Sequence, residues 1–196
     1  MQNPNESHWE ALQRVFSYLK GSMQRGFTYR RSAGGLIGYT DADWAGDRDT
    51  RKSTSGYVFL MQGAPISWRS KRQECVALST AEAEYIAATE ATKESLFLKG
   101  IINTFLPIGR QLRTITIKGD NESCIRIRRN PEFHQRMKYI DLRYHFIRNH
   151  INNGDITLEW TPGANQLADG LTKSLPQTAF DTFVRKIGLT DGSPSE

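Results

Sequence analysis

Acidic side chains are the residues of this sequence whose spacing could support chemistry. Asp41 and Asp43 lie two apart in the segment GYTDADW, which alternates like a strand, so both carboxylates are expected on one face of a sheet. Clustered carboxylates on a central strand are costly unless a positive charge neutralises them, and a divalent cation is the usual solution. An acidic turn after the strand explains these two residues equally well.

A further acid lies on the long helix expected from Ser79 to about Phe105. Ser79 and Glu82 form an S-x-x-E capping box, which gives Glu82 a structural role at the helix start. Glu84 instead lies on a stripe of small residues that repeats at helical spacing and is suited to close packing on a sheet. Glu84 is therefore the better candidate for a functional acid.

Two more acids occur later in the chain. Asp120 ends the expected strand TITIKGD, where α/β sheets place their sites, although an N-cap role explains it as well. Asp169 is expected one turn into a helix with Asn165 as its N-cap, where the helix dipole favours an acid whatever its function. Each acid alone is ambiguous, but together with the acids on the first strand and the long helix they predict one site.

The elements that must position these acids follow from the hydrophobic pattern. Strands are expected in five segments, LIGYTDADW, SGYVFLM, PISWRS, TITIKGD and DITLEWTP. Three consecutive short strands form antiparallel pairs, whereas strands reached through helices are added in parallel. The predicted fold class is α/β, with a mixed five-stranded sheet flanked by helices. Four aromatic residues alternate within these strands and are expected in the core: Tyr57, Phe59, Trp68 and Trp160.

The chain divides into three expected parts. Residues 1–26 comprise a leading amphipathic helix over residues 7–20, started by a capping box of Ser7 and Glu10, and a glycine-rich connector. Residues 27–190 form the α/β domain, and residues 191–196 form a flexible tail.

The composition limits the class of protein. With 196 residues and 38% hydrophobic side chains, the chain can form one domain with a sizeable core, and its net charge of +5 suits a polyanionic partner. Two cysteines without a CxxC pair argue against a disulfide scaffold and a thiolate zinc site. No apolar run approaches the ~20 residues of a membrane span. We therefore expect a soluble protein of a reducing compartment with no membrane partner.

The chain resembles the RNase H domain of copia-type LTR retrotransposon Pol polyproteins. The matching stretches are GYTDADWAGD, RKSTSGYVFLMQGAPISWRSKRQ, STAEAEYIA, GDNESCI, KYIDLRYHFIR and TPGANQLADGLTK. The resemblance implies an RNase H-like fold and metal-dependent endonucleolytic hydrolysis of the RNA strand of RNA/DNA hybrids during reverse transcription. It implies that the hybrid and the reverse-transcriptase domain of the same polyprotein are partners, with an intracellular location in cytoplasmic virus-like particles or in the nucleus.

The resemblance also assigns the acids. Asp41, Glu84, Asp120 and Asp169 correspond to the catalytic and metal-binding quartet. Carboxylates without Cys or His ligands select Mg2+, with Mn2+ as a substitute, and two ions about 3.5–4 Å apart would activate a water and stabilise the leaving oxygen. Asp41 is expected to bridge the ions, Glu84 and Asp120 to hold the one near the leaving group, and Asp169 the other. Unlike many cellular RNases H, the chain has no histidine in the loop before Asp169.

Substrate contacts are expected at two places. Ser79 and Thr80 fall where relatives hold a DNA phosphate, at a helix N-terminus suited to anions. Basic residues precede this helix or lie between the fourth and fifth strands: Arg69, Lys71 and Arg72, then Arg126, Arg128, Arg129, Arg136 and Lys138. They are candidates for phosphate contacts, and a solvated charged face is the alternative.

Two other functions are compatible with the fold. A catalytically silent domain could bind the hybrid and tether it for a polymerase. A DNA strand-transfer nuclease would place a glutamate on a late helix and lack the acid on the helix after the third strand, unlike this sequence.

Overall fold

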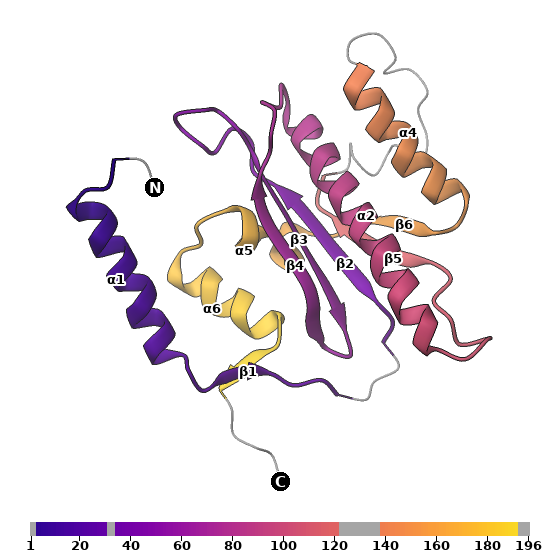
Figure 1. Cartoon of the computed structure of the whole chain (residues 1–196), viewed down its shortest axis with the longest axis horizontal. Coiled ribbons are helices and arrows are strands. Elements are labelled where there is room, and N and C mark those ends of the chain that lie inside the picture. Colours follow the sequence, from indigo (N-terminus) through magenta and orange to yellow (C-terminus); the bar gives the residue numbers. More distant parts are fainter. Residues whose placement is uncertain (1–2, 31–33, 122–137, 192–196) are drawn as a thin grey trace.

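A five-stranded mixed sheet forms the centre of the molecule. The computed structural model describes residues 3–30, 34–121 and 138–191. The strands of the sheet are β2 (Ile37–Ala42), β3 (Thr54–Met61), β4 (Ala64–Arg72), β5 (Ile115–Gly119) and β6 (Ile156–Trp160). Their order is β4-β3-β2-β5-β6, with β2, β3 and β4 antiparallel and β5 and β6 added in parallel (Figure 1). The predicted sheet is therefore confirmed.

The hairpin between β3 and β4 follows from its turn residues. Gln62 and Gly63 both have positive φ angles, 55° and 83°. Two consecutive residues in this region make the primed type of turn, whose twist matches that of antiparallel strands. Glycine adopts this conformation without steric cost, so the QGA segment fixes the hairpin.

Helix α2 (Thr80–Phe105) covers one face of the sheet. Its small residues Ala88 and Ala91 are buried in a common core with Tyr57 and Phe59 of β3. Alanine at these positions lets the helix approach the sheet closely. Helix α4 (Lys138–Asn152) lies beyond α2 (Figure 1) and contributes Ile147 to the same core. No helix of the described residues is long and apolar enough to cross a membrane.

The opposite face of β3 receives the short helix α5 (Asp169–Thr172). Successive residues of a strand point to opposite faces, so Gly56 faces away from the side that Tyr57 presents to α2. A Cβ atom on Gly56 would lie 2.7 Å from the Thr172 side chain and 3.2 Å from the backbone oxygen of Ala168. Helix α5 can therefore approach the sheet only because residue 56 has no side chain.

Gly56→Ala is expected to lower the free energy of unfolding by about 1–3 kcal/mol, because the added methyl group overpacks the contact with α5. Denaturant unfolding measures the change. Gly100→Ala is the matched control, since no described residue beyond its chain neighbours and the adjacent helix backbone lies within 4 Å of a Cβ at this position of α2. In a helix interior this control is expected to be neutral or stabilising by up to ~1 kcal/mol. Equal stabilities of Gly56→Ala and the wild type would contradict the packing argument.

The chain then continues through α6 (Gln177–Lys186), which follows the 3-10 turn η2 (Gly163–Asn165) and α5. It ends in strand β7 (Leu189–Asp191), which pairs antiparallel with β1 (Arg25–Phe27). The segment expected as a connector thus contains a strand. Its partner is more than 160 residues away, so local sequence carries no signal of the pairing.

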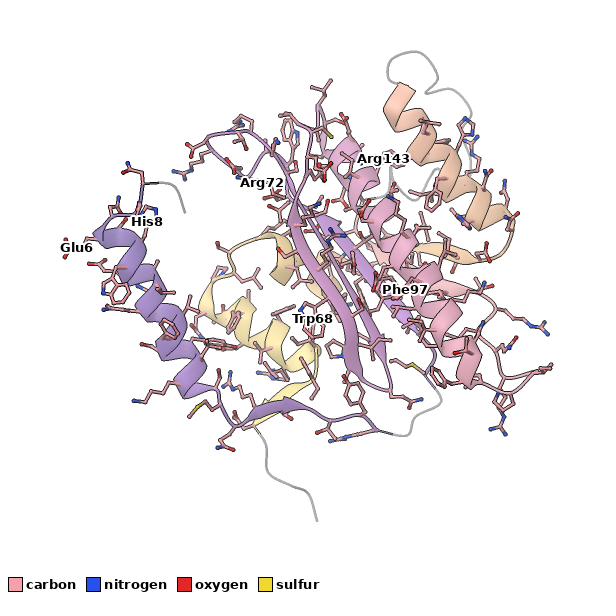
Figure 2. All side chains as sticks on the ribbon, in the orientation of Figure 1. Glu6, His8, Trp68, Arg72, Phe97 and Arg143 are labelled. Carbon is pink, nitrogen blue, oxygen red and sulfur yellow. The ribbon has the colours of Figure 1, made fainter. Side chains whose placement is uncertain are left out.

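The leading helix α1 (Glu6–Gly21) is confirmed, but its start differs from the prediction. Asn5, rather than Ser7, is the N-cap: its side chain accepts from the His8 backbone, and the His8 ring accepts from the Asn5 backbone. Figure 2 labels His8 at this end. No residue of α1 is buried, and the Tyr18 ring contacts Phe180 of α6 at 5.9 Å between centroids. The apolar residues of α1 are therefore largely exposed.

Candidate active site

Three acids from distant parts of the sequence meet at one edge of the sheet. Asp41 lies near the end of β2, Asp120 directly follows β5, and Asp169 is the first residue of α5. One carboxylate oxygen from each lies within 4.8 Å of the other two. Because β2 and β5 are parallel neighbours, their carboxyl ends reach the same edge of the sheet. The structure thus brings together three of the four predicted acids.

Asp41 is the most deeply buried of the three, with 1% of its surface exposed. Its Oδ2 accepts a hydrogen bond from the Thr172 hydroxyl and lies 3.3 Å from the Lys173 Nζ. Its Oδ1 is buried and has no hydrogen-bond partner among the residues that the structure describes. A buried carboxylate oxygen without a donor is costly, and a cation removes that cost. These acids therefore fit a divalent metal ion.

The loop before Asp169 is anchored by Gln166. Its side-chain nitrogen donates to the Thr40 carbonyl at 3.0 Å, and its side-chain oxygen accepts from the Ala168 backbone at 3.1 Å. The prediction that Asn165 is the N-cap of a helix through Asp169 is wrong. Asn165 ends the 3-10 turn, and the backbone is then extended at Gln166. Asp169 instead begins α5, with Ala168 before it.

Glu84 lies beside the three-acid group, buried on α2 with 7% exposure. Burial, together with the charges of Asp41 and Asp120, raises the pKa of Glu84 to about 9, despite a hydrogen bond from the Ala42 backbone. Glu84 is therefore protonated at neutral pH in the metal-free protein. Glu82, by contrast, accepts a hydrogen bond from the Leu78 backbone at 2.7 Å, which confirms its structural role at the helix start.

Asp41 also has a shifted acidity. Burial raises its pKa to about 6, and the neighbouring charges of Asp169 and Asp120 add to this rise. The hydrogen bond from Thr172 and the charge of Lys173 act in the opposite direction. In the metal-free site at neutral pH, the Asp41 carboxylate is therefore stabilised by the Lys173 ammonium group and the Thr172 hydroxyl group.

Lys173 supplies the positive charge of the metal-free site. Its Nζ lies 2.7 Å from Asp169 Oδ1, in addition to its contact with Asp41. Burial alone would lower the pKa of Lys173, but the hydrogen bond to Asp169 and the charges of both acids outweigh burial and raise it. The ammonium group is therefore protonated throughout the physiological range.

Asp43 does not join the site. Strand β2 ends at Ala42, and the Asp43 carboxylate accepts a hydrogen bond from the Thr54 backbone. The expected common face of Asp41 and Asp43 is therefore wrong, because the chain leaves the strand between them.

Comparison with known proteins gives the family. The Retrovirus-related Pol polyprotein from transposon TNT 1-94 of Nicotiana tabacum is 40% identical over 189 residues, which are 96% of this chain and 14% of that protein. The Pol polyprotein from transposon RE2 of Arabidopsis thaliana is 42% identical over 197 residues, covering all of this chain and 13% of that protein. The chain belongs to the copia-type retrotransposon Pol polyproteins. It spans about one seventh of the length of these relatives.

Solved structures give the fold of this Pol segment. LC11-RNase H1, solved in complex with an RNA/DNA hybrid, matches 70% of this chain and 94% of its own with a TM-score of 0.51 and 15% identity. RNase H1 from Halobacterium salinarum NRC-1 matches 76% of this chain and 98% of its own with a TM-score of 0.51 and 16% identity. The predicted RNase H-like fold is confirmed. No protein-family model matches the sequence.

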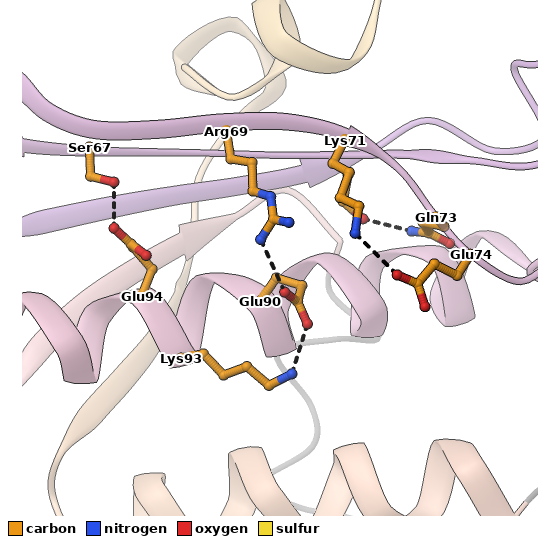
Figure 3. Close-up of polar contacts among 9 residues, drawn as sticks. Ser67, Arg69, Lys71, Gln73, Glu74, Glu90, Lys93 and Glu94 are labelled. Carbon is orange, nitrogen blue, oxygen red and sulfur yellow. Dashed lines mark hydrogen bonds and ion pairs between the residues drawn. The ribbon is translucent and has the colours of Figure 1, made fainter.

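The basic residues of β4 that were predicted to contact substrate phosphates form ion pairs with carboxylates of the protein itself. Arg69 lies 3.4 Å from Glu90 of α2, and Lys71 lies 3.1 Å from Glu74 (Figure 3). Arg72, labelled in Figure 2, pairs with an aspartate of the loop after β2, Asp47. A phosphate would therefore have to compete with these carboxylates.

The remaining predicted substrate contacts lie in two places. Ser79 is the N-cap of α2 and, like Thr80, is exposed at the helix N-terminus. Arg126, Arg128, Arg129 and Arg136 lie outside the described residues, as does the side chain of Lys138.

Thr172, Lys173 and Gln166 are site residues that the sequence reasoning missed. They flank Asp169 in the quoted stretch TPGANQLADGLTK, but their types have no pattern of their own that indicates contact with Asp41 or Thr40. Only their shared motif with Asp169 was a signal that they could belong to the site.

Proposed function

We propose that this chain is a ribonuclease H that hydrolyses the RNA strand of RNA/DNA hybrids during retrotransposon reverse transcription. The observation that carries the proposal is the group formed by Asp41, Asp120 and Asp169, in which one buried oxygen of Asp41 has no hydrogen-bond partner within the described parts of the chain. The RNase H-like fold and the Pol polyprotein relatives support it.

Asp41, Asp120 and Asp169 would hold the metal, with Glu84 beside them. Their donors are carboxylate oxygens, which favour Mg2+, with Mn2+ as a substitute, over zinc. Two such ions supply activation of a water and stabilisation of the leaving oxygen of a phosphodiester.

The protein side of the mechanism is preorganisation. Thr172 fixes the orientation of the Asp41 carboxylate, and Gln166 fixes the loop that carries Asp169. Ser79 and Thr80 would bind a phosphate of the DNA strand at the N-terminus of α2, where backbone N–H groups and the helix dipole favour an anion. The contacts of Thr172 and Gln166 thus set the positions of Asp41 and Asp169 before the substrate binds.

The reverse-transcriptase domain of the same polyprotein is the proposed protein partner. The exposed apolar face of α1 supports this contact, with Trp9, Val15 and Phe16 open to solvent. The relatives are polyproteins in which this segment is a small part.

The test is cleavage of an end-labelled RNA/DNA hybrid in Mg2+, beside an RNA duplex, a DNA duplex and single-stranded RNA. We expect cleavage of the hybrid alone, at internal positions of the RNA strand. EDTA should abolish the reaction, and added Mg2+ should restore it, because carboxylates without a cation repel the phosphate. Hybrid binding without cleavage in either Mg2+ or Mn2+ would instead identify a catalytically silent tether.

A further inference from the structure

Lys173 makes the only ion pairs to the three-acid group among the residues that the structure describes. It follows α5 and lies four residues after Asp169, so one helical turn brings its ammonium group back to that carboxylate. The same Nζ also reaches Asp41, which lies on β2 and is 132 residues away in the sequence. One side chain thus bridges two of the acids that would hold a metal.

This bridge differs from an ordinary surface ion pair. Exposed pairs contribute little because water already solvates both charges. Asp41 is almost completely buried, so its carboxylate depends on protein partners for compensation. The Lys173 side chain is 44% exposed, which leaves it free to move away from the acids into solvent.

We propose that Lys173 is a resident cation of the acid site, which neutralises Asp41 and Asp169 in the metal-free protein and competes with a divalent ion for them. The inference rests on the proposed metal site. A divalent ion and the ammonium group attract the same two carboxylates while repelling each other, so binding of one weakens binding of the other. Lys173 therefore lowers the affinity for the ion and favours its release.

A lysine that returns to the acids offers a way to empty the site between turnovers. Removal of its charge should then tighten metal binding and slow the release of products.

The experiment is calorimetric titration of the metal-free protein with MgCl2 and, separately, with MnCl2. Lys173→Gln is expected to bind the ion about tenfold or more tightly than the wild type. This change corresponds to the free energy of one hydrogen bond to a charged group, because the ion no longer has to displace the Lys173 ammonium group from the carboxylates. Lys173→Arg keeps the charge and is expected to remain close to the wild type. Lys99→Gln is the matched control, because Lys99 forms a partly buried ion pair with Asp155 at 2.8 Å, away from the three-acid group.

Thermal unfolding adds a readout that a merely structural ion pair would not change. Without metal, Lys173→Gln should unfold at a lower temperature than the wild type, because the acids lose their counter-charge. Saturating Mg2+ should remove or reverse this difference, whereas the deficit of Lys99→Gln should be independent of Mg2+. Unchanged metal affinity of Lys173→Gln, or no metal binding by any variant, would overturn the inference.

The inference and the proposed function can fail separately. Tighter metal binding by Lys173→Gln in a protein that cleaves no hybrid would support the resident cation and contradict the nuclease. Hybrid cleavage by the wild type, with unchanged metal affinity in Lys173→Gln, would support the nuclease and contradict the resident cation.

Discussion

Asp41→Asn is expected to reduce hybrid cleavage by about a thousandfold or more, which corresponds to ~4 kcal/mol of transition-state stabilisation. Asparagine has nearly the same shape and can still accept the hydrogen bond from Thr172. It removes the negative charge from the centre of the three-acid group and leaves one fewer anionic ligand for the metal. Initial rates on a labelled hybrid in Mg2+ measure the effect.

Asp43→Asn is the matched control for this substitution. Asp43 is two residues away, and its carboxylate accepts from the Thr54 backbone rather than joining the site, a contact that asparagine can retain. We expect activity within a few-fold of the wild type. Equal rates for Asp41→Asn and Asp43→Asn would contradict the assignment of the site.

Glu84→Gln is expected to stabilise the metal-free protein by about 1–3 kcal/mol at pH 8 while impairing cleavage. The pKa of Glu84 is raised from its ordinary value of 4.5 to about 9. Between these values the folded state retains a proton that the unfolded state has lost, so the free energy of unfolding of the wild type falls as pH rises. Glutamine cannot ionise and removes this loss.

Denaturant unfolding in EDTA from pH 5 to pH 9 measures the difference. The advantage of Glu84→Gln over the wild type should be small at pH 5 and increase toward pH 9. Glu82→Gln is the control, since Glu82 lies one half-turn away and accepts from the Leu78 backbone. It should not remove the loss of stability at high pH. If the free energies of unfolding of Glu84→Gln and the wild type differ by the same amount at every pH, burial and the nearby acids do not raise the pKa of Glu84.

Local patterns in the sequence were sufficient for most of the architecture. Alternation identified the five strands, and their connections predicted which would be antiparallel and which parallel. The capping box of Ser79 and Glu82 predicted the start of α2, and the structure confirms Ser79 as the N-cap. The Glu82 side chain accepts from the backbone of Leu78, one residue before the cap, rather than from that of Ser79. These features depend on neighbouring residues and on chain connectivity, which a single sequence contains.

The position of a strand within the sheet was not available from the sequence. Tyr57 and Phe59 are buried, as expected, because β3 is an interior strand. Trp68 and Trp160 are exposed instead, which corrects the prediction that they lie in the core. They lie on β4 and β6, the two edge strands, where less of the molecule covers a side chain. Figure 2 shows Trp68 on its strand.

The sequence by itself determined the fold class, the acids that could meet and the kind of ion they favour. Only the tertiary structure decided that Thr172 and Lys173 join Asp41 from 131 and 132 residues away, and that the pKa of Glu84 is raised to about 9 in the metal-free protein. The reason is that hydrophobic periodicity describes contacts within one element. Burial and charge compensation arise where several elements meet, and they depend on distances that local sequence does not specify.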